Sequence, residues 1–322
     1  MLTSNAFGET STEAIWHNKI PPLSSEAAVD IDKDPNLLHK YADNAGTKIH
    51  YVTMGSDKNQ LMVFVHGFPD FWYSWRNQIQ TFSKDYQVVA LDLRGYNLSG
   101  KPSGVDNYKV PVLLDDMRAA IDAERKGRKV ILVGHDWGAA LSWLFTGQNP
   151  DWVERLVVLS VPHPGAIRKE LLPWNHPLAQ FRASAYATRF FAQGKGDHLT
   201  PQELAYWVLD PQAKSRYIEA FTKSSIASLT NYYKANYAIS QTVLNLFDSS
   251  MRKIYGATIQ CPVLHVHGSE EHHALLSSIE LEKSWMESPD KLTVKIVPGV
   301  GHFIQREAPD YLNQTIAAWL KT

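Results

Sequence analysis

Short apolar runs rich in β-branched residues alternate along this chain with segments long enough to form helices. Runs of this composition are typical of strands that are buried on both faces of a parallel sheet. Successive parallel strands need a crossover connection, and a helix usually provides it. The sequence therefore predicts an α/β fold, with a mostly parallel sheet flanked by helices. The apolar runs are residues 61–66, 87–93, 129–134, 155–161, 261–268 and 291–297.

Three further segments carry a clear period. Residues 47–54 alternate between apolar and polar side chains, which predicts a strand with an exposed face. Residues 72–82 and 112–127 place their apolar side chains at helical spacing. Both helical segments lie between apolar runs, as crossovers should.

The alternation breaks once, between Pro162 and about Thr258, where helical periodicity recurs without a convincing buried strand. An inserted helical unit at residues 163–258 is the simplest explanation. The rest then forms one core in two parts, residues 38–162 and 259–322. Residues 1–37 are mostly polar and show little periodicity, so we expect them to be an N-terminal extension.

The composition excludes several classes of protein. A hydrophobic fraction of 44% in 322 residues is enough for a large buried core. The net charge is −1, from 32 basic and 33 acidic residues, which leaves no general field to hold nucleic acid. Cys261 is the only cysteine, so no internal disulfide forms. No run approaches the roughly 18 apolar residues of a membrane span. We expect a soluble, cytoplasmic protein.

The chemistry begins at residues 134–138, which read Gly-His-Asp-Trp-Gly directly after a predicted buried strand and before a helical segment. A turn this sharp between strand and helix strains its central residue and needs small neighbours, which Gly134 and Gly138 provide. Asp136 stands at the centre, where a serine is more usual. A carboxylate attacks a saturated carbon that bears a leaving group or a strained ring, and the product is an ester on the enzyme.

Hydrolysis of such an ester needs an oxyanion hole and a base. The backbone N–H of Trp137, beside the nucleophile, is one expected donor, and the N–H of Phe68 in the segment His-Gly-Phe-Pro is the other. His302 follows the last predicted strand and is the expected base. A Gly-x-Asp-x-Gly segment alone is ordinary turn chemistry. Its coincidence with the other two segments, each after a strand, favours catalysis.

An acid should orient the histidine, and it should follow the strand at residues 261–268. Glu271 is the expected acid, with Glu270 as the alternative. Four histidines near this strand raise the question of a metal site, but their spacing matches no ligand signature. The proposed reaction needs neither a metal nor a cofactor. Asp70, Trp72 and Trp75 are interpreted as structural. The four histidines are His265, His267, His272 and His273.

Four motifs in order closely resemble the soluble epoxide hydrolases of the α/β-hydrolase fold. They are His-Gly-Phe-Pro at 66–69, Asp-Leu-Arg-Gly-Tyr-Asn-Leu-Ser-Gly-Lys-Pro at 92–102, Gly-His-Asp-Trp-Gly at 134–138 and Gly-His-Phe at 301–303. The resemblance covers residue 38 to the end. It implies a helical cap inserted after the sixth strand, a small epoxide and water as reactants, and a vicinal diol as product. The many aromatic residues at 163–258 suggest that the epoxide is apolar or aromatic.

The resemblance also implies two cap tyrosines that protonate the epoxide oxygen. Tyr186, before an aromatic-rich helix end, and Tyr233, after Asn231-Tyr232, match these positions. A neutral phenol supplies a proton without placing a charge in an apolar pocket.

Two other functions stay open on the sequence. A haloalkane dehalogenase would use the same Asp136 and His302, and Trp137 would suit halide binding, although Phe68 stands where one branch of those enzymes has an asparagine. A ligand-binding module without catalysis would use the fold alone. The sequence does not predict the oligomeric state.

Overall fold

The computed structural model describes residues 30–170, 198–236 and 248–322. Their strands form one eight-stranded sheet in the order β1-β2-β4-β3-β5-β6-β7-β8. β2 runs antiparallel to its neighbours β1 and β4, and every pair from β4 to β8 is parallel. The mostly parallel sheet predicted from the sequence is confirmed. The strands are β1 Leu38–Asn44, β2 Thr47–Met54, β3 Leu61–Val65, β4 Gln87–Leu91, β5 Val130–His135, β6 Val153–Leu159, β7 Val263–Gly268 and β8 Leu292–Val297.

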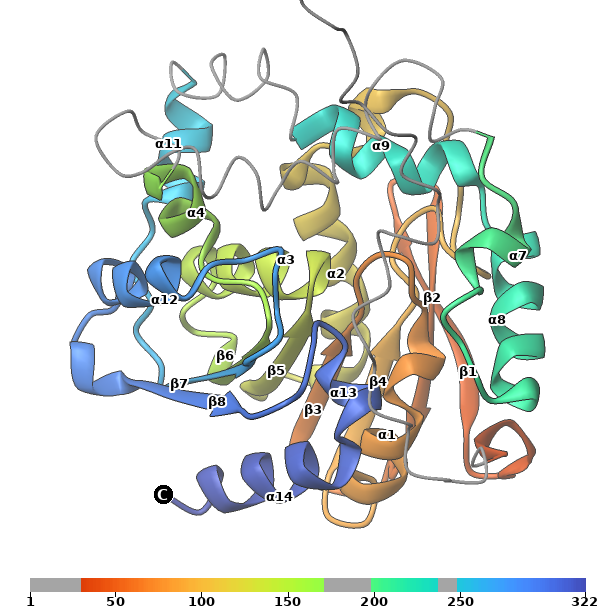
Figure 1. Ribbon diagram of the computed structural model, residues 1–322, viewed down its shortest axis with the longest axis horizontal. Coiled ribbons are helices and arrows are strands. Elements are labelled where there is room, and N and C mark those ends of the chain that lie inside the picture. The colour runs from red at the N-terminus through yellow and green to blue at the C-terminus, as the bar shows by residue number, and fades with distance from the viewer. Residues whose placement is uncertain (1–29, 171–197, 237–247) are drawn as a thin grey trace, which may run out of the picture.

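Helices cover both faces of the sheet (Figure 1). Helices α1, α13 and α14 pack together on one side, and α2 and α3 pack together on the other. The helices of the sheet core are α1 Arg76–Phe82, α2 Val110–Arg125, α3 Trp137–Gln148, α12 Leu276–Glu282, α13 Ile304–Glu307 and α14 Pro309–Trp319. Short 3₁₀ helices are η2 Ile31–Lys33, η3 Trp72–Trp75, η4 Val105–Tyr108, η7 Lys283–Trp285 and η8 Pro289–Lys291.

The described residues between β6 and β7 form helices joined by loops and add no strand to the sheet. Its helices lie along the upper and right-hand edges of the molecule in Figure 1. Asp210 caps one of them by accepting a hydrogen bond from the N–H of Ala213 at 2.6 Å, and Thr200 forms a capping box with Glu203 on another. These helices are α4 Pro164–Glu170, α7 Pro201–Leu204, α8 Pro211–Lys223, α9 Ile226–Asn236 and α11 Ser249–Tyr255.

Burial along the strands follows their place in the sheet. Every residue of β3, β4 and β5 is buried, as expected for central strands covered on both faces. β8 was expected to be buried as well, and this is wrong: it is the edge strand, and Val294 and Ile296 are 37% and 42% exposed. Its β-branched residues signal a strand but not its position.

Two differences arise at the other edge. Residues 47–54 form the predicted strand, β2, but its expected exposed face is wrong because β1, β4 and α2 surround it. β1 itself was not predicted. Its side chains are mostly exposed or half-buried, so the sequence carries no run of apolar residues there. Edge strands with polar side chains are common because they resist pairing with other chains.

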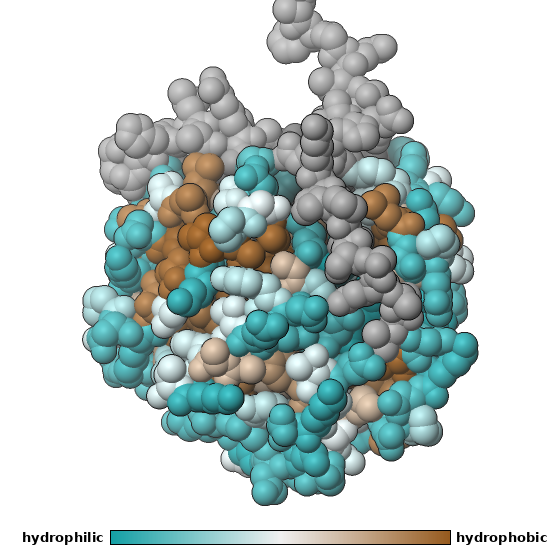
Figure 2. Space-filling view, turned by 60° about the horizontal axis from the view of Figure 1, so that its bottom comes forward, coloured by the Kyte–Doolittle hydropathy of each residue, from teal (hydrophilic) through white to brown (hydrophobic). Residues whose placement is uncertain are grey.

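Among the described residues, no helix is long and apolar enough to cross a membrane. The surface in Figure 2 is mainly hydrophilic over its lower part, and apolar residues gather toward its upper left. The apolar interior is continuous from the sheet into the helices between β6 and β7, since Tyr217, Phe221 and Leu229 belong to the same buried cluster as the strands. The helices between β6 and β7 are therefore packed onto the core.

The turn between β5 and α3 is as tight as the sequence predicts. Asp136 has φ 53° and ψ −121°, in the region that non-glycine residues rarely adopt. Gly138 lies so close to β3 that a Cβ atom there would overlap the carbonyl oxygens of Val65 and His66. The backbone strain at Asp136 is thus sustained by packing of the helix start against the neighbouring strand.

We expect Gly138→Ala to lower the free energy of unfolding by at least about 2 kcal/mol, because the close approach of α3 and β3 has no room for the methyl group. Urea denaturation measures the loss. Gly127→Ala is the matched control: Gly127 has a positive φ of 80° but open space around it, so its cost is limited to about 1 kcal/mol of backbone strain. Equal losses in the two variants would contradict the packing argument.

Candidate active site

Loops from four parallel strands bring the expected site residues together. Asp136 follows β5, Glu271 follows β7, His302 follows β8 and Phe68 follows β3. The carboxyl ends of parallel strands meet at one edge of the sheet, so side chains far apart in the sequence converge there. The side chains of Asp136 and His302 are 9% and 12% exposed, which leaves a small opening at an otherwise buried site.

The two oxygens of the Asp136 carboxylate have different partners. Oδ1 accepts a hydrogen bond from the backbone N–H of Phe68 at 2.7 Å. Oδ2 lies 3.4 Å from Nε2 of His302. One oxygen is thus held by a backbone donor, and the other faces the histidine.

Glu271 supports the far side of the same histidine. Its Oε2 contacts Nδ1 of His302, and its Oε1 accepts a hydrogen bond from the N–H of His273 at 2.6 Å. The Glu271 side chain has no exposed surface. Glu270, the alternative from the sequence, is exposed and contacts Ser269. The structure therefore brings Glu271, and not Glu270, against His302.

Charges at the site reinforce one another. Burial opposes protonation of His302, but the negative charge of Glu271 and the hydrogen bond to Asp136 raise its pKa to about 10. Burial of Glu271 favours its neutral form, yet the adjacent His302 charge lowers the pKa of Glu271 to about 2. Burial likewise opposes ionisation of Asp136, and the hydrogen bond and charge of His302 nevertheless lower its pKa. The resting site thus holds an imidazolium between two carboxylates.

His135, the residue before the nucleophile, is fully buried beside His302, and their ring centroids are 4.7 Å apart. Burial and the charge of His302 lower the pKa of His135 to about 3, so it is neutral. Its Nε2 lies 2.9 Å from the backbone oxygen of His302, which also accepts a hydrogen bond from Oγ of Ser160 at 2.6 Å. The loop that carries His302 is therefore held by its main chain as well as by its ring.

Phe68 and Trp137, the two expected oxyanion-hole residues, both contact Tyr233. Trp137 is the first residue of α3, so its N–H belongs to the start of a helix. The ring of Tyr233, on α9, packs edge-on against Phe68 and Trp137, with centroid distances of 5.5 Å and 5.3 Å. Tyr233 is buried. Its neighbour Tyr232 also packs its ring against Trp137, with a centroid distance of 5.5 Å, and its hydroxyl donates a hydrogen bond to the backbone oxygen of Arg94 at 2.8 Å. Tyr186 lies outside the described residues.

The histidines near β7 hold no metal constellation among the residues that the structure describes. His265 and His267 are both buried on β7, and Nδ1 of His265 lies 2.9 Å from the Glu282 carboxylate. His272 is exposed. His265 is thus a buried core histidine whose partner is the carboxylate of Glu282.

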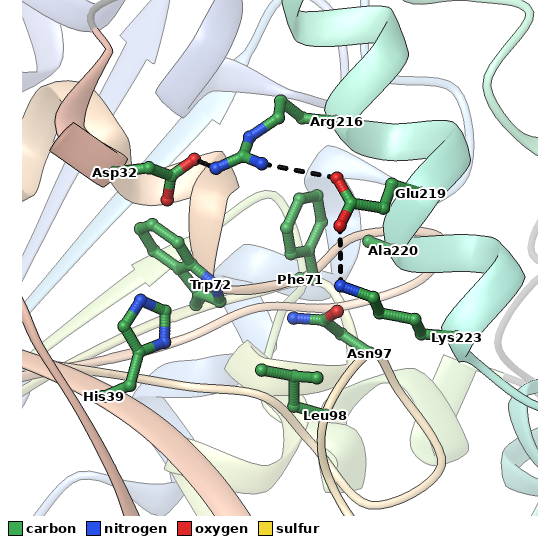
Figure 3. Close-up of a pocket in the computed structure, with 10 residues that line it drawn as sticks. All are labelled: Asp32, His39, Phe71, Trp72, Asn97, Leu98, Arg216, Glu219, Ala220 and Lys223. Atoms are coloured by element: carbon green, nitrogen blue, oxygen red, sulfur yellow. Dashed lines mark hydrogen bonds and ion pairs between the residues drawn. The ribbon is translucent and has the colours of Figure 1, made fainter.

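A second concave feature lies away from the site, between α8 and the core (Figure 3). It is a cavity of about 70 Å³ beside Trp72 and His39. Its charged side chains pair with one another: Arg216 contacts Asp32, and Glu219 accepts hydrogen bonds from Arg216 at 3.3 Å and Lys223 at 2.6 Å. None of the expected site residues lines it, so it is not the reaction site.

Known proteins resemble this chain over most of its length. A family model described as the alpha/beta hydrolase fold matches residues 60–309. Epoxide hydrolase 1 of Caenorhabditis elegans is 32% identical, over 89% of this chain and 72% of that protein. Epoxide hydrolase 4 of Mus musculus is 32% identical, over 89% and 81%. The crystal structure of a mutant of an epoxide hydrolase from Bacillus megaterium is 29% identical and has a TM-score of 0.74, covering 88% of this chain and all of the other.

We expect the folded state to lose stability as the pH rises from about 6.5 to about 10, because the folded protein keeps the His302 proton that the unfolded chain releases. His302→Gln removes this dependence, which amounts to about 5 kcal/mol across the window. Urea denaturation of the wild type and the variant at several pH values measures the difference. His272→Gln, at an exposed histidine, should keep the wild-type slope. Parallel curves for wild type and His302→Gln would contradict the raised pKa.

Proposed function

The chain belongs to the α/β-hydrolase fold family and, within it, to the epoxide hydrolases, which are hydrolases that act on ether bonds; from this we propose that it converts a small epoxide and water to a vicinal diol through a covalent ester on Asp136. The observation that carries the proposal is the division of labour between the two Asp136 oxygens. Oδ1 is held by the Phe68 N–H, and Oδ2 is turned toward His302.

In the first step Oδ2 attacks a ring carbon of the epoxide. A bond forms between Oδ2 and carbon, the ring carbon–oxygen bond breaks, and its electron pair stays on the epoxide oxygen. Tyr233 gives its phenolic proton to that oxygen. The contacts of Tyr233 with Phe68 and Trp137 support this role, because they hold its ring beside the nucleophile. Tyr186 is proposed as a second donor on the sequence alone, and residues 163–258 as the cap that encloses the substrate.

In the second step water attacks Cγ of the ester while Nε2 of His302 takes a water proton. Negative charge develops on Oδ1, which is the oxygen that already faces the Phe68 N–H; the N–H of Trp137 is the proposed second donor. Collapse of this intermediate breaks the bond between Cγ and Oδ2; Oδ2 takes the proton from His302 and leaves as a hydroxyl of the diol, and the proton of the new Asp136 carboxyl returns to His302. Glu271 keeps the imidazole oriented through Nδ1 and stabilises its positive charge.

Formation of the ester also prepares the base. The resting His302 is protonated, and a protonated imidazole cannot accept a proton from water. Once Asp136 is esterified it carries no charge, so its contribution to the raised pKa of His302 is lost. The imidazole can then give up its proton, which restores the phenol of Tyr233, and act on water. His302 is therefore able to act as a base on water only after the ester has formed.

The aromatic lining supports an apolar or aromatic substrate. The ring of Tyr233 packs against the rings of Phe68, whose N–H binds Asp136, and of Trp137, which follows Asp136 in the chain. A haloalkane would meet the same nucleophile and base, with halide in place of the epoxide oxygen as the leaving group. It would need no proton donor, whereas an epoxide does, and this favours the epoxide because the ring of Tyr233 packs against Phe68 and Trp137.

We expect His302→Gln, after incubation with styrene oxide, to gain the whole mass of the epoxide on Asp136, because the ester forms and no base hydrolyses it. Intact-mass spectrometry and peptide mapping measure the adduct and its position. Asp136→Ala is the control and should gain nothing.

The same variant is incubated separately with 1-bromohexane. An adduct only with this haloalkane, equal to its mass less hydrogen bromide, would make the enzyme a dehalogenase. No adduct with either compound would contradict the covalent mechanism.

We expect Tyr233→Phe to slow formation of the ester by about a hundredfold, because the epoxide oxygen loses a positioned proton donor. Single-turnover mixing in the His302→Gln background measures this step alone. Tyr232→Phe is the matched control: its hydroxyl serves the backbone of Arg94, so the rate of ester formation should stay near that of the parent. Equal effects of the two substitutions would assign Tyr233 to packing.

A further inference from the structure

A continuous chain of hydrogen bonds runs from the main chain of His302 into the core. Nε2 of His135 lies 2.9 Å from the His302 carbonyl oxygen, so Nε2 carries the proton and donates it. Neutral His135 then has an acceptor at Nδ1, and Nε2 of Gln305 donates to that atom at 3.1 Å. Both ring nitrogens of His135 are thus engaged, and its tautomer is fixed by its two partners.

The chain continues to a buried carboxylate that the sequence analysis interpreted as structural. Nε2 of Gln305 carries a second hydrogen, which it donates to Oδ2 of Asp70; the distance from Nε2 to Oδ2 is 3.5 Å. Oδ1 of Asp70 accepts a hydrogen bond from the hydroxyl of Tyr217 at 2.7 Å. Asp70 is completely buried, and its N–H donates to the carbonyl oxygen of Gly67 at 3.0 Å. Asp70 lies two residues after Phe68, so it belongs to the loop whose N–H binds Asp136.

Tyr217 belongs to α8, one of the helices between β6 and β7. Its ring packs edge-on against Phe71 and Trp207, at 5.0 Å and 4.9 Å. Arg306 lies over the ring of Trp207 at 3.4 Å, with its Nε 3.8 Å from Oδ2 of Asp70. The guanidinium of Arg306 and the hydroxyl of Tyr217 thus both approach the carboxylate of Asp70.

The other side of α8 is tied to the core less firmly. There the helix borders the cavity of Figure 3, and its ion pairs from Arg216 and Lys223 are partly exposed to water. Exposed ion pairs contribute little because water screens the charges and the side chains lose freedom. The bond between Tyr217 and Asp70 is buried, so it is a strong directional polar contact between this helix and the core. At the end of the helix, Oγ of its C-cap residue Ser224 also accepts a hydrogen bond from the N–H of Asn97 at 2.8 Å.

We propose that Asp70 is a positioning residue for hydrolysis of the ester, holding the His302 loop through Gln305 and His135 and holding helix α8 through Tyr217. This inference rests on the proposed function. Its consequence is that the base is correctly oriented only while α8 is seated on the core. Asp70 and Tyr217 touch neither the substrate nor the reacting atoms, and they act through His302.

The two steps of the reaction separate this role from a general loss of structure. His302 acts as the base in the second step, so a misplaced His302 slows hydrolysis and leaves attack by Asp136 intact. When the ester forms faster than it is hydrolysed, slower hydrolysis lowers kcat and KM by the same factor and leaves kcat/KM unchanged. A protein that is partly unfolded instead loses kcat in proportion to its folded fraction and keeps its KM.

The test uses Gln305→Met, which removes the central link at similar volume, and Tyr217→Phe, which removes only a hydroxyl. Their double variant completes a cycle. Steady-state kinetics with styrene oxide are combined with intact-mass measurement of the ester fraction during turnover. Tyr51→Phe is the matched control, because buried Tyr51 also donates to a buried carboxylate, Glu124, at 2.9 Å on the opposite side of the sheet.

We expect kcat and KM to fall together by about tenfold in Gln305→Met and by about fivefold in Tyr217→Phe, with ester accumulating during turnover in both. The double variant should resemble Gln305→Met, because Tyr217 acts through the link that Gln305→Met has already removed. Tyr51→Phe should keep the KM and the ester fraction of the wild type, whatever its effect on stability.

Two results would overturn the proposal. One is a wild-type KM and ester fraction in Gln305→Met, and the other is a double variant whose effect is the product of the two single effects. His302→Gln is measured alongside to separate this proposal from the one on which it rests. Ester that accumulates in His302→Gln but not in Gln305→Met refutes the positioning role alone. No ester in His302→Gln refutes the covalent mechanism, and the positioning role with it.

Discussion

The sharp turn at Asp136 is the constraint on which the rest of the site depends. Its positive φ is tolerated because α3 starts directly against β3, and that close approach requires a glycine at position 138. The turn points the carboxylate over the edge of the sheet where the loops after β3, β7 and β8 also end. Each of those loops then needs to contribute only one group: a backbone N–H at Phe68, a carboxylate at Glu271 and an imidazole at His302. The parallel order of the strands, rather than any long-range fit of side chains, brings the four groups together.

Electrostatics convert this geometry into a sequence of states. In the resting site a protonated His302 lies between Asp136 and Glu271, both ionised. The net charge of these three groups is negative, which suits attack on an electrophilic carbon. In the proposed reaction, alkylation of Asp136 removes one negative charge and leaves His302 with Glu271 as its only charged partner in this trio, so the imidazole becomes easier to deprotonate when the proposed base is required. On this proposal a single buried triad serves both steps, because the first step changes the electrostatic environment of the second.

Much of this could be predicted from the sequence, and the failures have physical reasons. The central strands are predictable because burial on both faces forces apolar β-branched runs, and the elbow is predictable because its glycines are sterically required. β1 was not predicted because an edge strand does not need an apolar run. The burial of β8 was mispredicted because β-branched residues occur in edge strands as well as in central ones. Glu271 could not be separated from Glu270 by spacing, since the difference lies in which side chain the turn directs inward. Asp70 was assigned to structure because a single buried carboxylate leaves no pattern in the sequence.

Buried carboxylates recur in this fold, and their partners determine what each one does. Asp116 is bound by Arg94 and Asn44, and Asp92 by His50, Asn97 and the N–H of Trp72; these partners belong to the core on its β1 and β2 side, so the two carboxylates fix loops in place. Asp70 is different because its partners come from the helices between β6 and β7 and from the segment after His302. A buried carboxylate is costly to leave without hydrogen-bond donors, so the loop of Asp70 depends for its stability on the segments that carry Tyr217 and Gln305. The same desolvation that makes the other carboxylates structural therefore makes Asp70 responsive to the position of α8, and connects the packing of that helix to the geometry of His302, the proposed base.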